Sequence, residues 1–256
     1  MTDHAERDSV VYVYGIVPAD VETDPEARGV GDPPSPVKAV KHDRIAALIS
    51  EIPRDKPLGR PEDLTAHAAL LDAAAAEVPV LPLRFGAVVA DEDAVGTELL
   101  EEHHDGFVAA LTELEGKAEY VVKARYLEDA ILQEVLGENE QLSELREAIR
   151  GKSEDATRNE RIALGEGINN AIAAKRDADT AKVADALTAL GARIAVREPT
   201  HEEDAVHLAC LAETAKQSDV EEAVDRIARD WDGRAQVRLL GPLAAYDFVV
   251  TQQPEA

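Results

Sequence analysis

The residues best suited to hold a metal ion lie together in Glu101-Glu102-His103-His104-Asp105. Imidazole and carboxylate groups are common zinc ligands, so this segment could bind a cation. The surrounding residues have helical spacing, however, and neighbouring side chains on a helix point about 100° apart. His103 and His104 therefore cannot both bind one ion together with Glu102. The i,i+4 pair Glu101–Asp105 could contribute, but Gly106 follows Asp105 directly. We predict an exposed helix face with one histidine at the margin of the core, which is favoured over the alternative of a metal site.

Two further segments resemble parts of known ligand-binding motifs. His201-Glu202-Glu203-Asp204 precedes His207, but Ala205 stands where a zinc-protease helix needs its second histidine. Gly165-Glu166-Gly167 resembles a fragment of a phosphate-binding loop, yet no strand precedes it and no Lys-Ser/Thr follows. We expect a packed helix at the two glycines and no metal at the histidines.

No group of residues suggests catalysis. The single cysteine, Cys210, lies in an apolar, strand-like run and is expected to be a buried structural thiol. No Ser-His-Asp or Cys-His grouping can be placed on the chain. We therefore predict a protein that is not an enzyme and has no catalytic residue, no cofactor and no metal.

The chain is organised around the apolar run Val78–Val89. Its composition predicts a strand buried on both faces, with its first half at an edge or bulge because Pro79 and Pro82 cannot donate to a ladder. Arg84 is the exception, since a guanidinium in an apolar run must find carboxylate or carbonyl partners. We expect a structural arginine that ties the strand to a loop, and the alternative is an anion-binding arginine.

The charge balance restricts the possible partners. The 256 residues carry 52 Asp and Glu against 27 Lys and Arg, a formal net charge of -25. Nucleic acid is excluded because phosphate binding needs a basic surface. The acidic excess, with little aromatic content, is typical of halophilic cytoplasmic proteins; an acidic surface that binds a basic partner is the alternative. The polar N-terminus argues against a secretory signal, and no apolar run reaches membrane length, so we expect no membrane association.

The pattern of elements predicts an α+β fold with two domains. Strand signals at Val10–Val17, 37–40 and 45–49 are followed by a helix from Pro61 and, after the central run, by a helix capped at Asp91. Gly116-Lys117 ends this first domain, so the predicted boundaries are 1–117 and 118–256. The second domain has the order β-α-β-β-α-β of ferredoxin-like folds, with an enlarged helical segment over 129–191. The inner stripe of the helix from Pro61 is expected to include Leu64 and His67, and residues 246–250 are expected to extend the last sheet.

Three segments resemble the gas vesicle protein F/L family. They are Val80-Leu81-Pro82-Leu83-Arg84-Phe85-Gly86 in the centre, Tyr12-Val13-Tyr14-Gly15-Ile16-Val17 near the start and Gly241-Pro242-Leu243-Ala244-Ala245-Tyr246-Asp247-Phe248-Val249 near the end. They occur in the family's order and span nearly the whole chain. Leu243-Ala244-Ala245 departs from the bulkier Trp-Pro-Pro that members commonly carry. The motif residues to which we assign structural roles are Tyr14, Gly15, Pro82, Arg84, Phe85, Gly86, Gly241, Pro242, Tyr246 and Phe248.

The resemblance implies an accessory protein of gas vesicle assembly, located in the cytoplasm and associated with gas vesicles. Its implied partners are the small hydrophobic shell protein and other gas vesicle accessory proteins, which it would contact during nucleation or early assembly. It also implies a two-domain layout with a modified ferredoxin-like second domain. A ligand-sensing regulator is the alternative function, because ferredoxin-like domains often bind small molecules. The resemblance does not distinguish F-type from L-type members.

Overall fold

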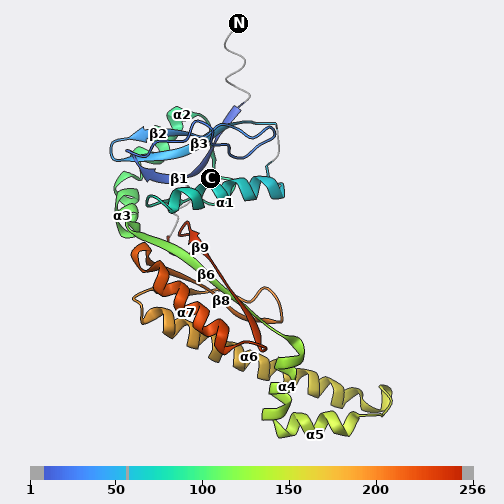
Figure 1. Ribbon diagram of the computed structural model, residues 1–256. Coiled ribbons are helices and arrows are strands. Elements are labelled where there is room, and N and C mark those ends of the chain that lie inside the picture. The colour runs from blue at the N-terminus through green and yellow to red at the C-terminus, as the bar shows by residue number, and fades with distance from the viewer. Residues whose placement is uncertain (1–8, 56–57, 250–256) are drawn as a thin grey trace. The chain divides into compact units, whose positions relative to one another are not determined.

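The computed structural model describes residues 9–55 and 58–249 of the chain (Figure 1). The fold is of the mixed α/β type, with two antiparallel sheets and seven α-helices among the described residues. It divides into two compact units. The first holds the described residues up to Tyr120, together with Leu211–Ala215 and those from Gly241 onward, and the second holds Val121–Cys210 and Lys216–Leu240. No helix in the described ranges combines the length and the apolar character that a membrane span requires.

The sheet of the first unit is built around its opening strand. The order is β2-β3-β1-β4, and β5 also pairs with β1; all the pairings are antiparallel. The strands predicted at 37–40 and 45–49 correspond to β2 and β3, and Asp43 in the turn between them adopts a left-handed φ of 50°. The strands are β1 (Ser9–Pro18), β2 (Lys38–His42), β3 (Ile45–Pro53), β4 (Leu81–Pro82) and β5 (Val88–Val89).

A β-bulge in β1 decides which side chains reach each face of this sheet. The register against β3 shifts between Val13 and Gly15. An extra residue in one strand reverses the alternation beyond it. Val11 and Val13 therefore share one buried cluster with Ile16, whereas Tyr12 and Tyr14 share the opposite cluster with Val17. The sheet is consequently buried on both faces.

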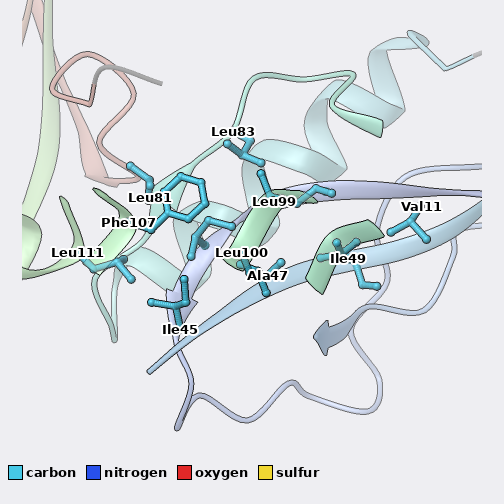
Figure 2. Close-up of a cluster of buried hydrophobic side chains, with 13 residues drawn as sticks. Val11, Ile45, Ala47, Ile49, Leu81, Leu83, Leu99, Leu100, Phe107 and Leu111 are labelled. Atoms are coloured by element: carbon cyan, nitrogen blue, oxygen red, sulfur yellow. The ribbon is translucent and has the colours of Figure 1, made fainter. Parts of the chain in front are cut away.

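Helices cover both faces of the sheet. On one face lie η1 (Val95–Glu101), a π-helical segment, and α3 (His104–Leu114), whose Leu99, Leu100, Phe107 and Leu111 pack on Val11, Ile45 and Ile49 (Figure 2). The short α2 (Glu92–Ala94) precedes η1 and is capped by Asp91, whose side chain accepts from the Ala94 N–H, as predicted. On the other face lies α1 (Pro61–Ala75), which buries His67, Leu71 and Ala75.

A buried carboxylate fixes the start of α1. Asp63 is almost fully buried and accepts hydrogen bonds from the backbone N–H groups of Gly31, Gly59 and Arg60. Burial alone would raise its pKa, but the hydrogen bonds and the Arg60 guanidinium hold the pKa below its ordinary value. Asp63 thus takes the inner position that we had predicted for Leu64. Leu64 is instead 49% exposed, so that prediction is wrong.

Two other predictions about this unit are also wrong. Val78–Val89 is not one buried strand, because β4 and β5 each contribute two residues and a turn separates them. Gly86 in that turn has a φ of 93°, which a continuous strand cannot accommodate. Residues 246–248 form a turn, and 246–249 do not extend a sheet; Val250 lies outside the described residues.

The second unit combines a four-stranded sheet of order β7-β8-β6-β9 with two long helices. Helices α6 and α7 lie side by side along the sheet in Figure 1, and α7 buries Val220, Val224 and Ile227. The strands and helices of this unit follow the predicted order, with the enlarged helical segment between the first two strands. They are β6 (Lys117–Tyr126), α4 (Glu128–Glu138), α5 (Glu140–Ile149), η2 (Asp155–Thr157), α6 (Arg158–Thr188), β7 (Arg193–Val196), β8 (Asp204–Glu213), η3 (Thr214–Lys216), α7 (Gln217–Asp230) and β9 (Ala235–Leu243).

A network of charges ties α4 and α6 to the chain just before β9. The Arg234 guanidinium lies 2.6 Å from Glu134 and 2.7 Å from Asp179. Lys175 lies 2.6 Å from Glu134, and the Tyr126 hydroxyl donates to Asp179 at 2.6 Å. Burial alone would lower the pKa of Arg234, but the two carboxylates raise it. The network joins segments that lie 100 residues apart in the sequence.

Candidate functional site

The three segments that carry the family resemblance meet in one aromatic cluster of the first unit. Tyr12 and Tyr14 come from β1, Phe85 from the turn between β4 and β5, and Tyr246 from the segment after β9. His67 of α1 lies at the centre, with its ring centroid 5.7 Å from those of Tyr12, Tyr14 and Phe85 and 6.4 Å from that of Tyr246. We call these five residues the aromatic cluster.

Hydrogen bonds fix the inner part of the aromatic cluster. The Tyr12 hydroxyl lies 2.8 Å from Nδ1 of His67 and accepts from the Gly86 N–H at 3.2 Å. The Tyr14 hydroxyl donates to Ser50 Oγ at 2.9 Å and accepts from the Val30 N–H at 2.9 Å. These bonds connect β1 with α1, with the central motif and with the loop before β2.

The electrostatics of the aromatic cluster favour uncharged side chains. Burial raises the pKa of Tyr12, Tyr14 and Tyr246 above the ordinary tyrosine value. Burial also lowers the pKa of His67, because the imidazolium form loses hydration there. All four groups are therefore neutral near pH 7. Such a cluster can pack and present apolar surface more readily than it can hold a charged ligand.

Two motif glycines allow close approach of neighbouring backbone. A Cβ on Gly15 would lie 2.8 Å from the Leu81 carbonyl oxygen, so only glycine lets β4 pair so closely with β1. Gly241 has a φ of 140°, and a Cβ there would lie 2.7 Å from Cδ1 of Tyr120. The sequence assigned both glycines structural roles, and their surroundings give those roles a physical cause.

The closing segment is held by two carboxylates of the same unit. The Ala244 N–H donates to Asp72 of α1 at 3.0 Å, and the Asp247 N–H donates to Glu119 at 3.0 Å. Phe248 packs against a small buried cluster that includes Leu114. Tyr246 is placed over His67 by these contacts, although its side chain remains 37% exposed.

Comparison with known proteins gives this site a family. The family model described as "Gas vesicle synthesis protein GvpL/GvpF" matches residues 10–250, which include all three motif segments. The chain belongs to the GvpL/GvpF family. Gas vesicle protein F of Streptomyces sp. (strain CB03234) is 34% identical over 242 residues, with 93% of this chain and 98% of that protein covered. Gas vesicle protein F of Dolichospermum flosaquae is 28% identical, with 93% and 96% covered.

Solved structures of GvpL/GvpF proteins share the fold. The crystal structure of GvpF from Anabaena sp. PCC7120 superimposes with a TM-score of 0.77 at 26% identity, covering 94% of this chain and 98% of that one. GvpF from Microcystis aeruginosa superimposes with a TM-score of 0.75 at 22% identity, covering 93% and 98%. The family match supports a role of this chain in gas vesicle formation.

The position of Arg84 corrects the structural role that we predicted for it in this GvpL/GvpF chain. Its side chain is exposed in the turn between β4 and β5, not buried in a strand. In the described residues its guanidinium has neither an ion pair nor a hydrogen bond. The buried positions of this motif are residues 80–83, and Phe85 is partly buried in the aromatic cluster. Because the turn is exposed, the Arg84 guanidinium stays hydrated and needs no buried partner, contrary to our prediction.

The other candidate residues are explained by local structure. Nε2 of His104 lies 3.1 Å from the Asp43 carboxylate, and its Nδ1 lies 3.0 Å from that of Asp105. In residues 9–55 and 58–249, no group of three or more potential ligands that could hold a metal is found. A Cβ on Gly167 would meet Leu142 of α5, which confirms tight helix packing at that glycine. Gly165 is exposed and a Cβ there would meet no described atom outside its own helix within 4 Å, so the expectation of packing is wrong for it. Cys210 is a buried free thiol. The absence of a cofactor and of catalysis stays a prediction.

Sequence reasoning did not identify Asp63 as a key residue or Tyr12 and His67 as hydrogen-bonding partners. The signal for Asp63 was present, since an acidic residue three positions after the helix cap often bonds the backbone N–H groups there. Tyr12 and His67 gave no comparable signal. They lie 55 residues apart, and nothing in the sequence indicates that they pair.

Proposed function

We propose that this protein binds the small hydrophobic shell protein of gas vesicles, together with other accessory proteins, during nucleation or early assembly. Family membership supports the setting, because the chain matches the gas vesicle synthesis family over nearly its whole length. A shell subunit is apolar and prone to aggregate before it joins a wall. A soluble partner that covers its apolar face would delay this aggregation.

The observation that carries this proposal is the exposure of two large side chains, Leu64 and Tyr246, on segments that contribute to the aromatic cluster; we call these two residues the apolar rim. Leu64 is 49% exposed on α1, three residues before the buried His67. Tyr246 is 37% exposed and packs on the same histidine. Phe85 is partly buried and packs on the same histidine. Large exposed apolar side chains over a neutral cluster form a surface to which an apolar helix can bind.

A pull-down with matched variants tests the assignment. Tagged protein is mixed with its cognate shell protein, and the captured shell protein is quantified for the native chain, for Leu64→Glu and for Tyr246→Glu. Both variants are expected to retain less than about a tenth of the capture, since a charge in a desolvated contact costs more than about 1.4 kcal/mol. Ile162→Glu is the matched control, because Ile162 is similarly exposed, at 51%, on α6 of the second unit.

The result that contradicts this assignment is equal capture by Leu64→Glu, Tyr246→Glu and the native chain. Loss of capture by Ile162→Glu to the same degree would also contradict it, because the rim would then not be special. Thermal melts of all three variants check that each is folded. Leu64 and Ile162 are exposed to similar degrees, so their substitutions are expected to leave stability within about 0.5 kcal/mol.

We propose further that the second unit corresponds to a ferredoxin-like domain with an enlarged helical insertion. Its element order and the strand order β7-β8-β6-β9 support this interpretation. The predicted boundary between residues 117 and 118 stays a prediction. We also propose a cytoplasmic, non-enzymatic protein of the halophilic type, a proposal supported by the net charge of -25.

A further inference from the structure

Basic side chains gather on one face of the second unit's sheet. Lys123 and Arg125 lie two residues apart on β6, and both are exposed, whereas Ala124 between them is buried. Arg238 is exposed on the neighbouring strand β9. Together with Gln236 and His201, these residues line a cavity of about 230 Å³. We call Lys123, Arg125 and Arg238 the basic face.

The basic face carries more positive charge than its surroundings neutralise. Its nearby carboxylate is Asp204, which lies 3.7 Å from Nε of Arg125. The other oxygen of Asp204 accepts from the backbone N–H groups of Thr200 and His201 and from the Thr200 hydroxyl. Within the part of the chain that the structure describes, Lys123 and Arg238 form no ion pair.

Three basic side chains on one face, with one carboxylate beside them in the described part of the chain, differ from the composition of this chain, in which acidic residues outnumber basic ones by 52 to 27. Elsewhere in the same unit, Lys175 and Arg234 each contact two carboxylates. The excess of acids makes such pairing easy to obtain. Single exposed basic residues such as Arg84 also lack an ion pair among the described residues, but Lys123 and Arg238 lie on one face with a third basic residue. This grouping, beside one carboxylate of the described residues, points to a partner that supplies negative charge.

The basic face lies beside an open sheet edge. Strand β9 ends the order β7-β8-β6-β9, so one side of its backbone faces no further strand of that sheet. Charged side chains often protect such edges against unwanted pairing, and Arg238 alone would serve that purpose. Lys123 and Arg125 lie on the inner strand β6, where edge protection needs no charge. Protection therefore does not explain the complete basic face.

We propose that β9 accepts an extended acidic segment of a partner protein as an added strand. An added strand would run about 4.8 Å from β9, and its alternate side chains, about 6.8 Å apart, would face the same side of the sheet as Arg238. Glu or Asp at those alternate positions can form an ion pair with Arg238. The long side chains of Lys123 and Arg125 on β6 can extend across β9 toward the same carboxylates. This interaction is independent of shell-protein binding, since it involves other residues.

A peptide-binding experiment tests the proposal on the full chain. The probe is a fluorescein-labelled peptide of five Thr-Glu repeats, and its binding is followed by fluorescence anisotropy at about 0.1 M salt, where charges beyond about 10 Å are screened. Saturable binding is expected, whereas a Thr-Gln peptide of equal length should bind at least tenfold more weakly. The Lys123→Glu/Arg238→Glu variant should weaken binding of the acidic peptide at least tenfold.

Matched controls separate the basic face from net charge. Arg146→Glu/Lys152→Glu changes the net charge equally, at exposed positions in and after α5, and should alter binding less than twofold. A Thr-Glu peptide with alternate N-methylated backbone nitrogens keeps its charge but cannot pair as a strand on its methylated side, and it should bind at least tenfold more weakly. Thermal melts confirm that each variant is folded.

Four outcomes would overturn the proposal. The first is that the acidic peptide shows no saturable binding. The second is equal binding by the native chain and Lys123→Glu/Arg238→Glu. The third is equal binding of the N-methylated peptide, which would show attraction by charge without strand addition. The fourth is displacement of the peptide by inorganic phosphate at the same concentration as by free peptide, which would identify a small-anion pocket.

Discussion

The hydrogen bond between Tyr12 and His67 provides the sharpest test of how the aromatic cluster is held together. In Tyr12→Phe, the Gly86 N–H lies in an exposed turn and can bond to water, so its loss costs little. Nδ1 of His67 cannot be satisfied in this way, because the side chain is 97% buried and a water molecule that replaced the Tyr12 hydroxyl would have to enter the core. An unsatisfied buried polar group costs about 1–3 kcal/mol.

We therefore expect Tyr12→Phe to lower the free energy of unfolding by about 1–3 kcal/mol, or the melting temperature by roughly 3–10 °C for a chain of this size. Urea unfolding followed by far-ultraviolet circular dichroism measures this change, with the m-value unchanged. Tyr246→Phe is the control, because the Tyr246 side chain is 37% exposed. Its effect should stay within about 0.5 kcal/mol.

A double-mutant cycle identifies the cause. If the cost comes from the orphaned Nδ1 of His67, Tyr12→Phe should cost nothing, or should stabilise, in a His67→Leu background. The coupling free energy should then be at least about 1 kcal/mol. An equal loss of stability in both backgrounds would refute the argument, because the hydroxyl would then act through contacts other than His67.

Three further predictions concern charge. Arg234→Met should destabilise the protein by about 2–4 kcal/mol in urea unfolding, because the guanidinium contacts Glu134 and Asp179 and its side chain is only 23% exposed. Arg226→Met breaks an exposed ion pair and should cost less than about 0.5 kcal/mol, and equal costs would contradict a stabilising role of the network. Burial lowers the pKa of His67, so below about pH 6.5 the unfolded chain binds a proton that the folded chain does not, and the free energy of unfolding falls on acidification. His67→Leu should reduce the slope of unfolding free energy against pH between pH 7 and 5 by up to about 1.4 kcal/mol per pH unit, and an unchanged slope would contradict this prediction. The net charge of -25 predicts a melting temperature many degrees higher in roughly 2–3 M KCl than in 0.1 M, because repulsion between the acidic side chains is screened as the Debye length falls from about 10 Å to below 3 Å. Equal melting temperatures would disprove the halophilic interpretation.

Local patterns predicted the elements that local interactions determine. The helix cap at Asp91, for example, follows from capping preferences that act over a few residues. The run Val78–Val89 was misjudged because its apolar composition suits a continuous strand as well as two short strands around a turn. Only the pairing of both pieces with β1 separates the two possibilities.

The candidate site depended on contacts that a single sequence does not contain. Gly86 and the Tyr12 hydroxyl, which it contacts, are 74 positions apart, and Asp72 holds a backbone group 172 positions away. The resemblance identified the three segments without indicating that they meet. Arg84 was misplaced for the same reason, because its burial was inferred from its neighbours in sequence and not from its neighbours in space.

The central claim is that this protein binds the shell protein of gas vesicles through the apolar rim of the aromatic cluster. Light scattering tests it most directly: denatured shell protein is diluted into buffer with an equimolar amount of this protein, of Leu64→Glu or of Ile162→Glu. We expect the native chain and Ile162→Glu to suppress the rise in scattering, and Leu64→Glu to leave it unsuppressed. An unsuppressed rise with the native chain, or equal suppression by Leu64→Glu, would contradict the claim.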